Sequence, residues 1–105
     1  MTAETVDLGS GYVLSWFGWF PDRDLNPQHK DHPDIERAGA VIRHRTPDGG
    51  ECTHGVTFDL PETAVLGDRH RGTVVSWEPL TLEPSLLCRR CGDHGWVRGG
   101  RWVPA

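Results

Sequence analysis

The chain lacks any run of about 20 consecutive apolar residues, the length that a membrane-spanning helix needs, so we expect no membrane partner. The segment Met1–Gly11 contains Glu4 and Asp7 but no basic residue, which is the wrong charge for a secretory signal. The sequence therefore predicts a cytosolic protein, and thiols stay reduced in that compartment.

Motifs of catalysis are also missing. The sequence contains no Ser-His-Asp order, no nucleophile elbow and no glycine-rich phosphate-binding loop. Asp22 and Asp24 form a possible carboxylate pair, but nothing in the pattern fixes their geometry. We therefore expect a protein that is not an enzyme. The alternative is a metal-dependent hydrolase, which requires an ion with an open coordination position.

Glycine and proline are abundant, with 13 and 8 of the 105 residues. Because both residues break helices, they exclude long helices and divide the chain into short segments. We predict one domain over residues 1–105 that is mostly β, a small sheet of short hairpins with little helix.

Several segments have the composition of strands. Tyr12–Phe20 and Thr73–Trp77 are rich in aromatic and β-branched residues. The strongest hairpin joins Ala40–Arg45 to Glu51–Phe58 through the turn residues Thr46–Gly50. Alternation along its second strand places the side chains of positions 52, 54, 56 and 58 on one face.

A second hairpin is predicted at the C-terminal end. Gly99 and Gly100 separate two short strand-like runs, as in a two-residue turn that needs positive φ angles. In that register Arg98 faces Arg101, and Val97 faces Trp102.

The acidic segment 21–38 reads as a loop, with one helical turn at Pro33–Ala38, and residues 61–66 as a short helix or an irregular turn. His29 and His32, with Asp31 and Asp34, are a weak candidate for a second metal site, because the surrounding loop has no supporting pattern.

Cysteine is scarce, and the odd number of three leaves one thiol outside any internal disulfide. Cys88 and Cys91 form a C-x2-C pair followed by Gly92, a spacing that lets two thiolates bind one ion at about 2.3 Å. With Cys52 on the predicted hairpin, this pattern predicts a structural Zn²⁺ site. Free thiols and a redox pair are the alternatives, although glycines rather than a helix follow Cys91.

The fourth ligand is left open between two histidines. His94 follows Cys91 with two residues between them, and we favour it slightly for this reason. His54 shares a strand face with Cys52 and is the alternate ligand. Either set is closed and tetrahedral, as in structural sites, and ties the C-terminal hairpin to the rest of the sheet.

The chain has five tryptophans, and we expect most of them in the core. A regular strand cannot turn Trp16 and Trp19 both inward, and Phe17 and Phe20 have the same difficulty. We therefore predict a contact surface for a protein partner at Trp16, Phe17, Trp19 and Phe20.

The net charge of −4 is unevenly distributed. Residues 1–36 contain seven acidic and two basic residues, whereas residues 37–105 contain eight acidic residues and nine arginines. The acidic first third argues against a general nucleic-acid binder. A small nucleic-acid-binding zinc protein stays as an alternative, with Arg89, Arg90, Arg98 and Trp96 as the contact residues.

The stretch 79–105 contains PSLLC, then CGDHG, and ends in R-x-G-x-W-V-P. In these motifs it resembles small uncharacterised proteins encoded by phages of actinobacteria and, more distantly, a bacterial and phage domain of unknown function with a Cys/His-containing hairpin. The turns PDRDLNPQ and PDGG fit the same group less specifically. The resemblance covers about a quarter of the chain and implies a phage source and a metal site at the CxxCGDH segment.

Together these features predict a phage-encoded zinc protein that acts as a non-enzymatic protein-interaction or virion-associated module. Its expected partner is a virion component or a host factor, and its expected location is the host cytoplasm or the virion. The sequence does not indicate which partner it binds.

Overall fold

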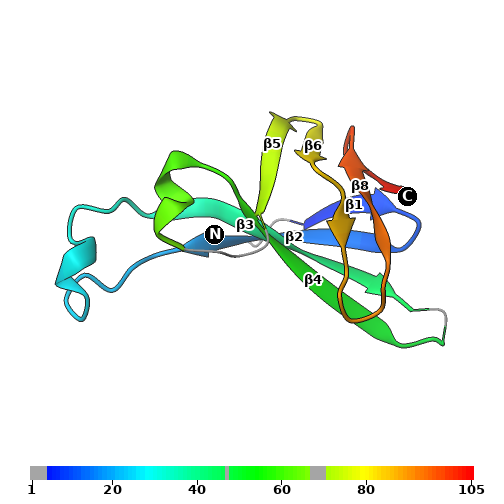
Figure 1. Cartoon of the computed structure of the whole chain (residues 1–105), viewed down its shortest axis with the longest axis horizontal. Helices are drawn as coiled ribbons and strands as arrows, with labels where there is room; N and C mark the ends of the chain where they lie inside the picture. Colours follow the sequence, from blue (N-terminus) through cyan, green and yellow to red (C-terminus); the bar gives the residue numbers. More distant parts are fainter. Residues whose placement is uncertain (1–4, 47, 67–70) are drawn as a thin grey trace.

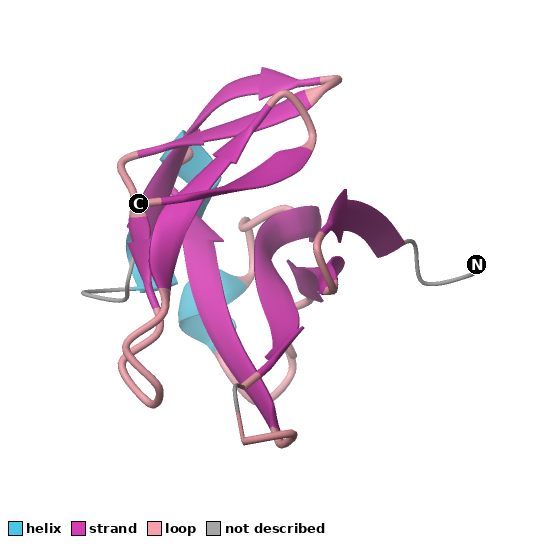
Figure 2. Cartoon of the chain, turned by 90° about the vertical axis from the view of Figure 1, so that its right-hand side faces the viewer, coloured by secondary structure: helices cyan, strands magenta, loops and turns pink. Residues whose placement is uncertain are grey.

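The computed structural model describes residues 5–46, 48–66 and 71–105 (Figure 1). Glu4 and Pro47, used in the sequence analysis, lie outside these ranges. Within them, the chain forms strands and two short 3-10 helices, so the prediction of a mostly β fold with little helix is confirmed (Figure 2).

The elements are β1 (Thr5–Gly9), β2 (Tyr12–Trp19), η1 (Pro27–His29), β3 (Ile35–Arg45), β4 (Glu51–Phe58), η2 (Pro61–Leu66), β5 (Arg71–Trp77), β6 (Leu80–Glu83), β7 (Leu86–Leu87), β8 (His94–Arg98) and β9 (Arg101–Pro104). No helix in these ranges has the length and apolar character needed to cross a membrane.

The strands form two sheets. Six of them follow the order β1-β2-β3-β4-β5-β6, and β7-β8-β9 form the second, smaller sheet. All neighbours are antiparallel except β4 and β5, which pair in parallel only at Thr57–Arg71 and Phe58–Gly72. The large sheet curls, and the small sheet packs between its two edge strands, β8 beside β6 and β9 beside β1.

One core joins the two sheets. Backbone N–H groups of the β8–β9 turn bond to β6, from Gly100 to the Leu80 carbonyl at 2.8 Å and from Gly99 to Thr81 Oγ1 at 3.0 Å. The small sheet therefore covers the open side of the curled sheet. Buried residues from both sheets form this core: Leu8, Leu14, Ala40, Ile42, Val56, Phe58, Leu80, Leu82, Leu86, Val97 and Trp102.

Both predicted hairpins are present, and the C-terminal one has the expected register. β3 and β4 pair from Arg45–Glu51 through His44–Cys52 to Gly39–Thr57. β8 and β9 pair Arg98 with Arg101 and Val97 with Trp102, across Gly99 and Gly100, which both have positive φ.

The predicted helical turn at Pro33–Ala38 is wrong. β3 begins at Ile35, which pairs with Trp19 of β2, and Ile35 and Ala38 are buried. An isolated helical turn pays a nucleation cost for few hydrogen bonds, whereas the edge of β2 offers these residues a ready ladder. The loop between β2 and β3 therefore ends at Asp34.

Candidate metal centre

The β3–β4 hairpin places two metal-ligand side chains opposite each other. His44 and Cys52 are cross-strand partners next to the turn, so both side chains lie on the same face of the sheet. The turn is closed by hydrogen bonds from Thr46 N–H to the Gly50 carbonyl and from Gly49 N–H to the Thr46 carbonyl, both 3.0 Å. Both side chains are buried, His44 with 2% and Cys52 with 5% of its surface exposed.

The connection between β7 and β8 supplies the other two metal-ligand side chains, those of Cys88 and Cys91. Gly92 N–H donates to the Cys88 carbonyl and Cys88 N–H to the Asp93 carbonyl, both at 2.7 Å. Gly92 has a φ of 79°, a left-handed conformation that glycine adopts without strain. This tight turn brings Cys88, which is buried, and Cys91, which is exposed, to face the hairpin.

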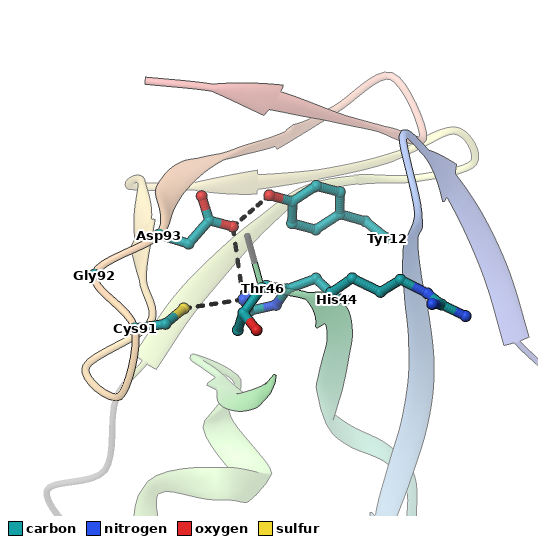
Figure 3. Close-up of a pocket in the computed structure, with 7 residues that line it drawn as sticks. Tyr12, His44, Thr46, Cys91, Gly92 and Asp93 are labelled. Atoms are coloured by element: carbon teal, nitrogen blue, oxygen red, sulfur yellow. Dashed lines mark hydrogen bonds and ion pairs between the residues drawn. The ribbon is translucent and has the colours of Figure 1, made fainter. Parts of the chain in front are cut away.

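A pocket of about 370 Å³ opens between these two segments (Figure 3). Tyr12 of β2 forms one wall, with its ring stacked between His44, at 5.2 Å, and Trp102, at 4.6 Å. Its hydroxyl donates a hydrogen bond to Asp93 Oδ2, which lies 3.7 Å from His44 Nε2. Burial, then the Asp93 carboxylate, raises the pKa of Tyr12 to about 12, so the phenol keeps its proton at neutral pH.

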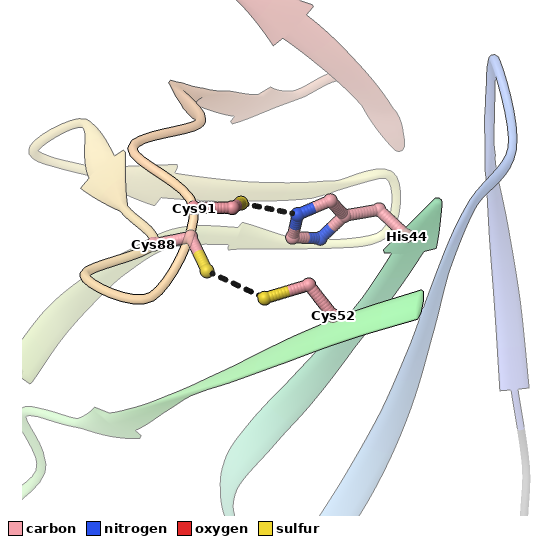
Figure 4. Close-up of side chains that lie close together, drawn as sticks. All are labelled: His44, Cys52, Cys88 and Cys91. Atoms are coloured by element: carbon pink, nitrogen blue, oxygen red, sulfur yellow. Dashed lines mark hydrogen bonds between the residues drawn. The ribbon is translucent and has the colours of Figure 1, made fainter. Parts of the chain in front are cut away.

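The four candidate ligand atoms lie within 4.8 Å of one another (Figure 4). Cys52 Sγ is 3.3 Å from Cys88 Sγ, and His44 Nε2 is 3.2 Å from Cys91 Sγ. Donor atoms bound to one tetrahedral ion at about 2.0–2.3 Å are separated by roughly 3.4–3.8 Å. His44, Cys52, Cys88 and Cys91 therefore could hold one metal ion.

Without a metal ion, the pKa values of the Cys88 and Cys52 thiols are shifted in opposite directions. Burial alone would raise the pKa of Cys88, but hydrogen bonds from the backbone of Cys91 and Arg90 and from the Cys52 thiol lower it. The hydrogen bond with Cys88 is the main cause that raises the pKa of Cys52 to about 11. Cys88 is thus the sulfur that the fold prepares to carry negative charge, as a metal ligand must.

The structure places the two predicted histidines differently. His94 is exposed, and its Nε2 lies 2.7 Å from Ser85 Oγ, with its ring stacked beside Trp96. The ring of His54 packs against His44 at 5.5 Å and Trp102 at 6.1 Å, and this residue is not part of the four-residue group. The fold brings His44 to the three cysteines in place of either.

His44 was not among the predicted ligands, although the sequence contains a signal for it. The predicted turn at residues 46–50 fixes the hairpin register. Counting outward from it pairs Arg45 with Glu51 and then His44 with Cys52. The two predicted histidines were instead those close to a cysteine in the sequence, His94 after Cys91 and His54 on the same strand face as Cys52.

The four aromatic residues of the predicted contact surface have different surroundings. Trp16 packs against Phe58 and Trp77. Trp19 contacts the rings of His29 and His32 in the loop after β2. Phe17 is half-buried and lies over Gly39, and Phe20 has 60% of its surface exposed.

The second metal candidate in the β2–β3 loop receives no support. Both ring nitrogens of His32 lie 2.7 Å from backbone carbonyl oxygens, those of Pro33 and Glu62. Of the residues that the structure describes, only His44, Cys52, Cys88 and Cys91 form a group that could hold a metal ion.

No family model matches the chain, and no curated protein or solved structure shows significant similarity to it. The resemblance of residues 79–105 to phage proteins, the expected protein partner and the expected location therefore stay predictions.

Proposed function

We propose that the chain binds one Zn²⁺ through His44, Cys52, Cys88 and Cys91, and that the ion is a structural staple of a non-enzymatic binding module. The convergence of the four side chains within 4.8 Å carries the proposal. Three sulfur donors and one imidazole suit Zn²⁺, and the short separations suit a single ion.

The ion would connect parts of the chain that are distant in sequence. Cys52 and Cys88 are 36 residues apart, and His44 and Cys91 are 47 apart. Bonds between them attach the end of the β3–β4 hairpin to the small sheet. Small domains often need such a staple, because their cores bury limited apolar surface.

Four protein donors complete a tetrahedron and leave no position for a substrate or an activated water molecule, which argues for a structural rather than a hydrolytic role. Tyr12 would then orient His44 by stacking on its ring, and the Asp93 carboxylate would add negative charge beside the cation.

Metal analysis of protein purified without added metal tests the proposal. We expect one zinc per chain in the wild type and in His94→Ala, and loss of zinc in His44→Ala and Cys88→Ser. Replacement by Co²⁺ should give intense thiolate-to-metal charge-transfer absorption in the wild type.

His94→Ala is the matched control, because it removes an imidazole from the same region and leaves the four donors intact. A wild type without stoichiometric zinc would refute the site. A His44→Ala variant that keeps its zinc while His94→Ala loses it would assign the fourth ligand to His94 instead.

A further inference from the structure

The small sheet presents one face to solvent. Gly95, Val97 and Trp102 are buried on its inner side, so the residues that alternate with them along β8 and β9 point outward. Cross-strand pairing adds Leu87 beside His94 and Val103 beside Trp96. We call this outer surface the small-sheet face: Leu87, His94, Trp96, Arg98, Arg101 and Val103.

A row of flat side chains lies along its central strand. The guanidinium carbon of Arg98 is 4.5 Å from the centre of the Trp96 ring. On the same strand, the His94 ring lies 6.1 Å from Trp96 and within 29° of parallel. Nucleic-acid bases stack on aromatic rings and on guanidinium planes whatever their sequence, so this row contains groups of the kind that bases contact.

The charge around this face is positive. Residues 84–105 contain four exposed arginines and one acidic residue, Asp93; Arg98 and Arg101 belong to the small-sheet face, whereas Arg89 and Arg90 lie in the turn between β7 and β8. Asp93 accepts a hydrogen bond from Tyr12 and lies close to His44. Arg98 lies 3.7 Å from Glu83, but both side chains are about half exposed, so this ion pair is weak and can be exchanged for a phosphate contact.

The acidic residues responsible for much of the negative net charge lie elsewhere. Asp22, Asp24, Asp31 and Asp34 belong to the β2–β3 loop, which is at the left end of the molecule in Figure 1, whereas β8 is in the right half. The molecule is 45 Å long. Charges are screened over about 8 Å at physiological ionic strength, so this loop has little effect at the small-sheet face.

From this geometry we infer that the small-sheet face binds single-stranded nucleic acid, the arginines contacting phosphates and the Trp96 row contacting bases. The inference builds on the proposed function, because the turn that carries Arg89 and Arg90 lies between two of the zinc ligands. The net charge of the whole chain argues against nucleic-acid binding. Attraction to phosphates depends, however, on the charge of the surface that contacts them, and here that charge is positive.

Fluorescence anisotropy of the zinc-loaded protein with a labelled single strand of about 12 nucleotides tests this, a length within the range of roughly 4–16 nucleotides that one single-strand-binding fold covers. We expect binding that weakens with salt. The double variant Arg98→Ala/Arg101→Ala should flatten the slope of log K against log salt by about 1.4, at about 0.7 per lost phosphate contact. Trp96→Ala should leave that slope unchanged and weaken binding roughly 5- to 150-fold.

The matched control is Arg43→Ala, which removes an exposed arginine from β3. No binding at low salt, an equal effect of Arg43→Ala, or equal affinity for a duplex of the same sequence would each overturn the inference. Zinc is measured in every sample. If the wild type carries zinc and does not bind nucleic acid, this inference alone is overturned. If it binds nucleic acid but is purified without zinc, the metal proposal alone is overturned. If Trp96→Ala does not fold, the arginine variants decide.

Discussion

Cys52 and Cys88 meet at the buried side of the centre, while Cys91 is exposed to solvent. In the metal-free protein their sulfur atoms, 3.3 Å apart, would be positioned to form a disulfide when an oxidant is supplied. The lowered pKa of Cys88 increases its fraction of thiolate, which is the reactive form.

We therefore predict that removal of the metal exposes the protein to internal oxidation. After a chelator has removed the metal, treatment with diamide should form a Cys52–Cys88 disulfide, because the two thiols give two hydrogens to this oxidant. Mass spectrometry of alkylated peptides should find this link, with Cys91 alkylated. The zinc-loaded protein should resist the same treatment, and Cys91→Ser should still form the link. A Cys88–Cys91 bond instead would contradict the observed arrangement of the sulfurs.

At the same scale, the three cysteines were identifiable from the sequence because C-x2-C spacing is a local property. The fourth member, His44, needs the register of a hairpin in addition, because it depends on which residue faces Cys52 across the strands. That pairing is a property of register, and only the turn chemistry at residues 46–50 encodes it.

Among the strands, β2, β3 and β4 form the tightly packed centre of the large sheet. Gly39 of β3 lies opposite Phe17 of β2, whose ring covers it. A Cβ atom at Gly39 would lie 2.3 Å from both the Phe17 ring and the Val56 carbonyl oxygen. No side-chain rotation relieves the contact with the backbone oxygen.

Gly39→Ala should therefore lower the free energy of unfolding by about 1–3 kcal/mol or more, as for overpacked cores. Gly55→Ala on β4 is the matched control, since its nearest neighbour would be the Ala40 carbonyl oxygen at 3.7 Å. Urea unfolding followed by tryptophan fluorescence measures both. Equal stability of the two variants would show that β3 does not approach β2 and β4 so closely at Gly39.

The strands with strong local signals were predictable, and those with weak ones were not. Tyr12–Trp19 and the two hairpins combine β-rich composition with turn residues. The first residues of β3 have a helix-like composition, and their strand conformation comes from pairing with β2, a tertiary effect. The two-residue strand β7 is too short to leave a pattern, and it exists because β8 pairs with it.

For the molecule as a whole, an ion in the candidate metal centre would add a connection between the two sheets to those made by the apolar core and the β6 hydrogen bonds. An ion that binds only the folded state stabilises it by about 4 kcal/mol at a thousandfold excess over its dissociation constant. For a domain of this size, that energy corresponds to about 15–30 °C in Tm.

We therefore predict that chelation with EDTA lowers Tm by at least this amount, and that Zn²⁺ restores it. Calorimetry measures the change, and hydrogen exchange should show that the amides of β7–β9 lose protection before those of β2–β4. An unchanged Tm in protein shown to be metal-free would mean that the core alone holds the small sheet in place.

The separation of acidic loop and basic sheet along the long axis has a consequence for how the molecule moves. The molecule is therefore an electric dipole, and the field of a nearby polyanion orients it with the basic sheet toward the polyanion before the two make contact. Adsorbed from dilute buffer on a negatively charged mineral such as mica, molecules should share one orientation, with the loop that follows β2 directed away from the support.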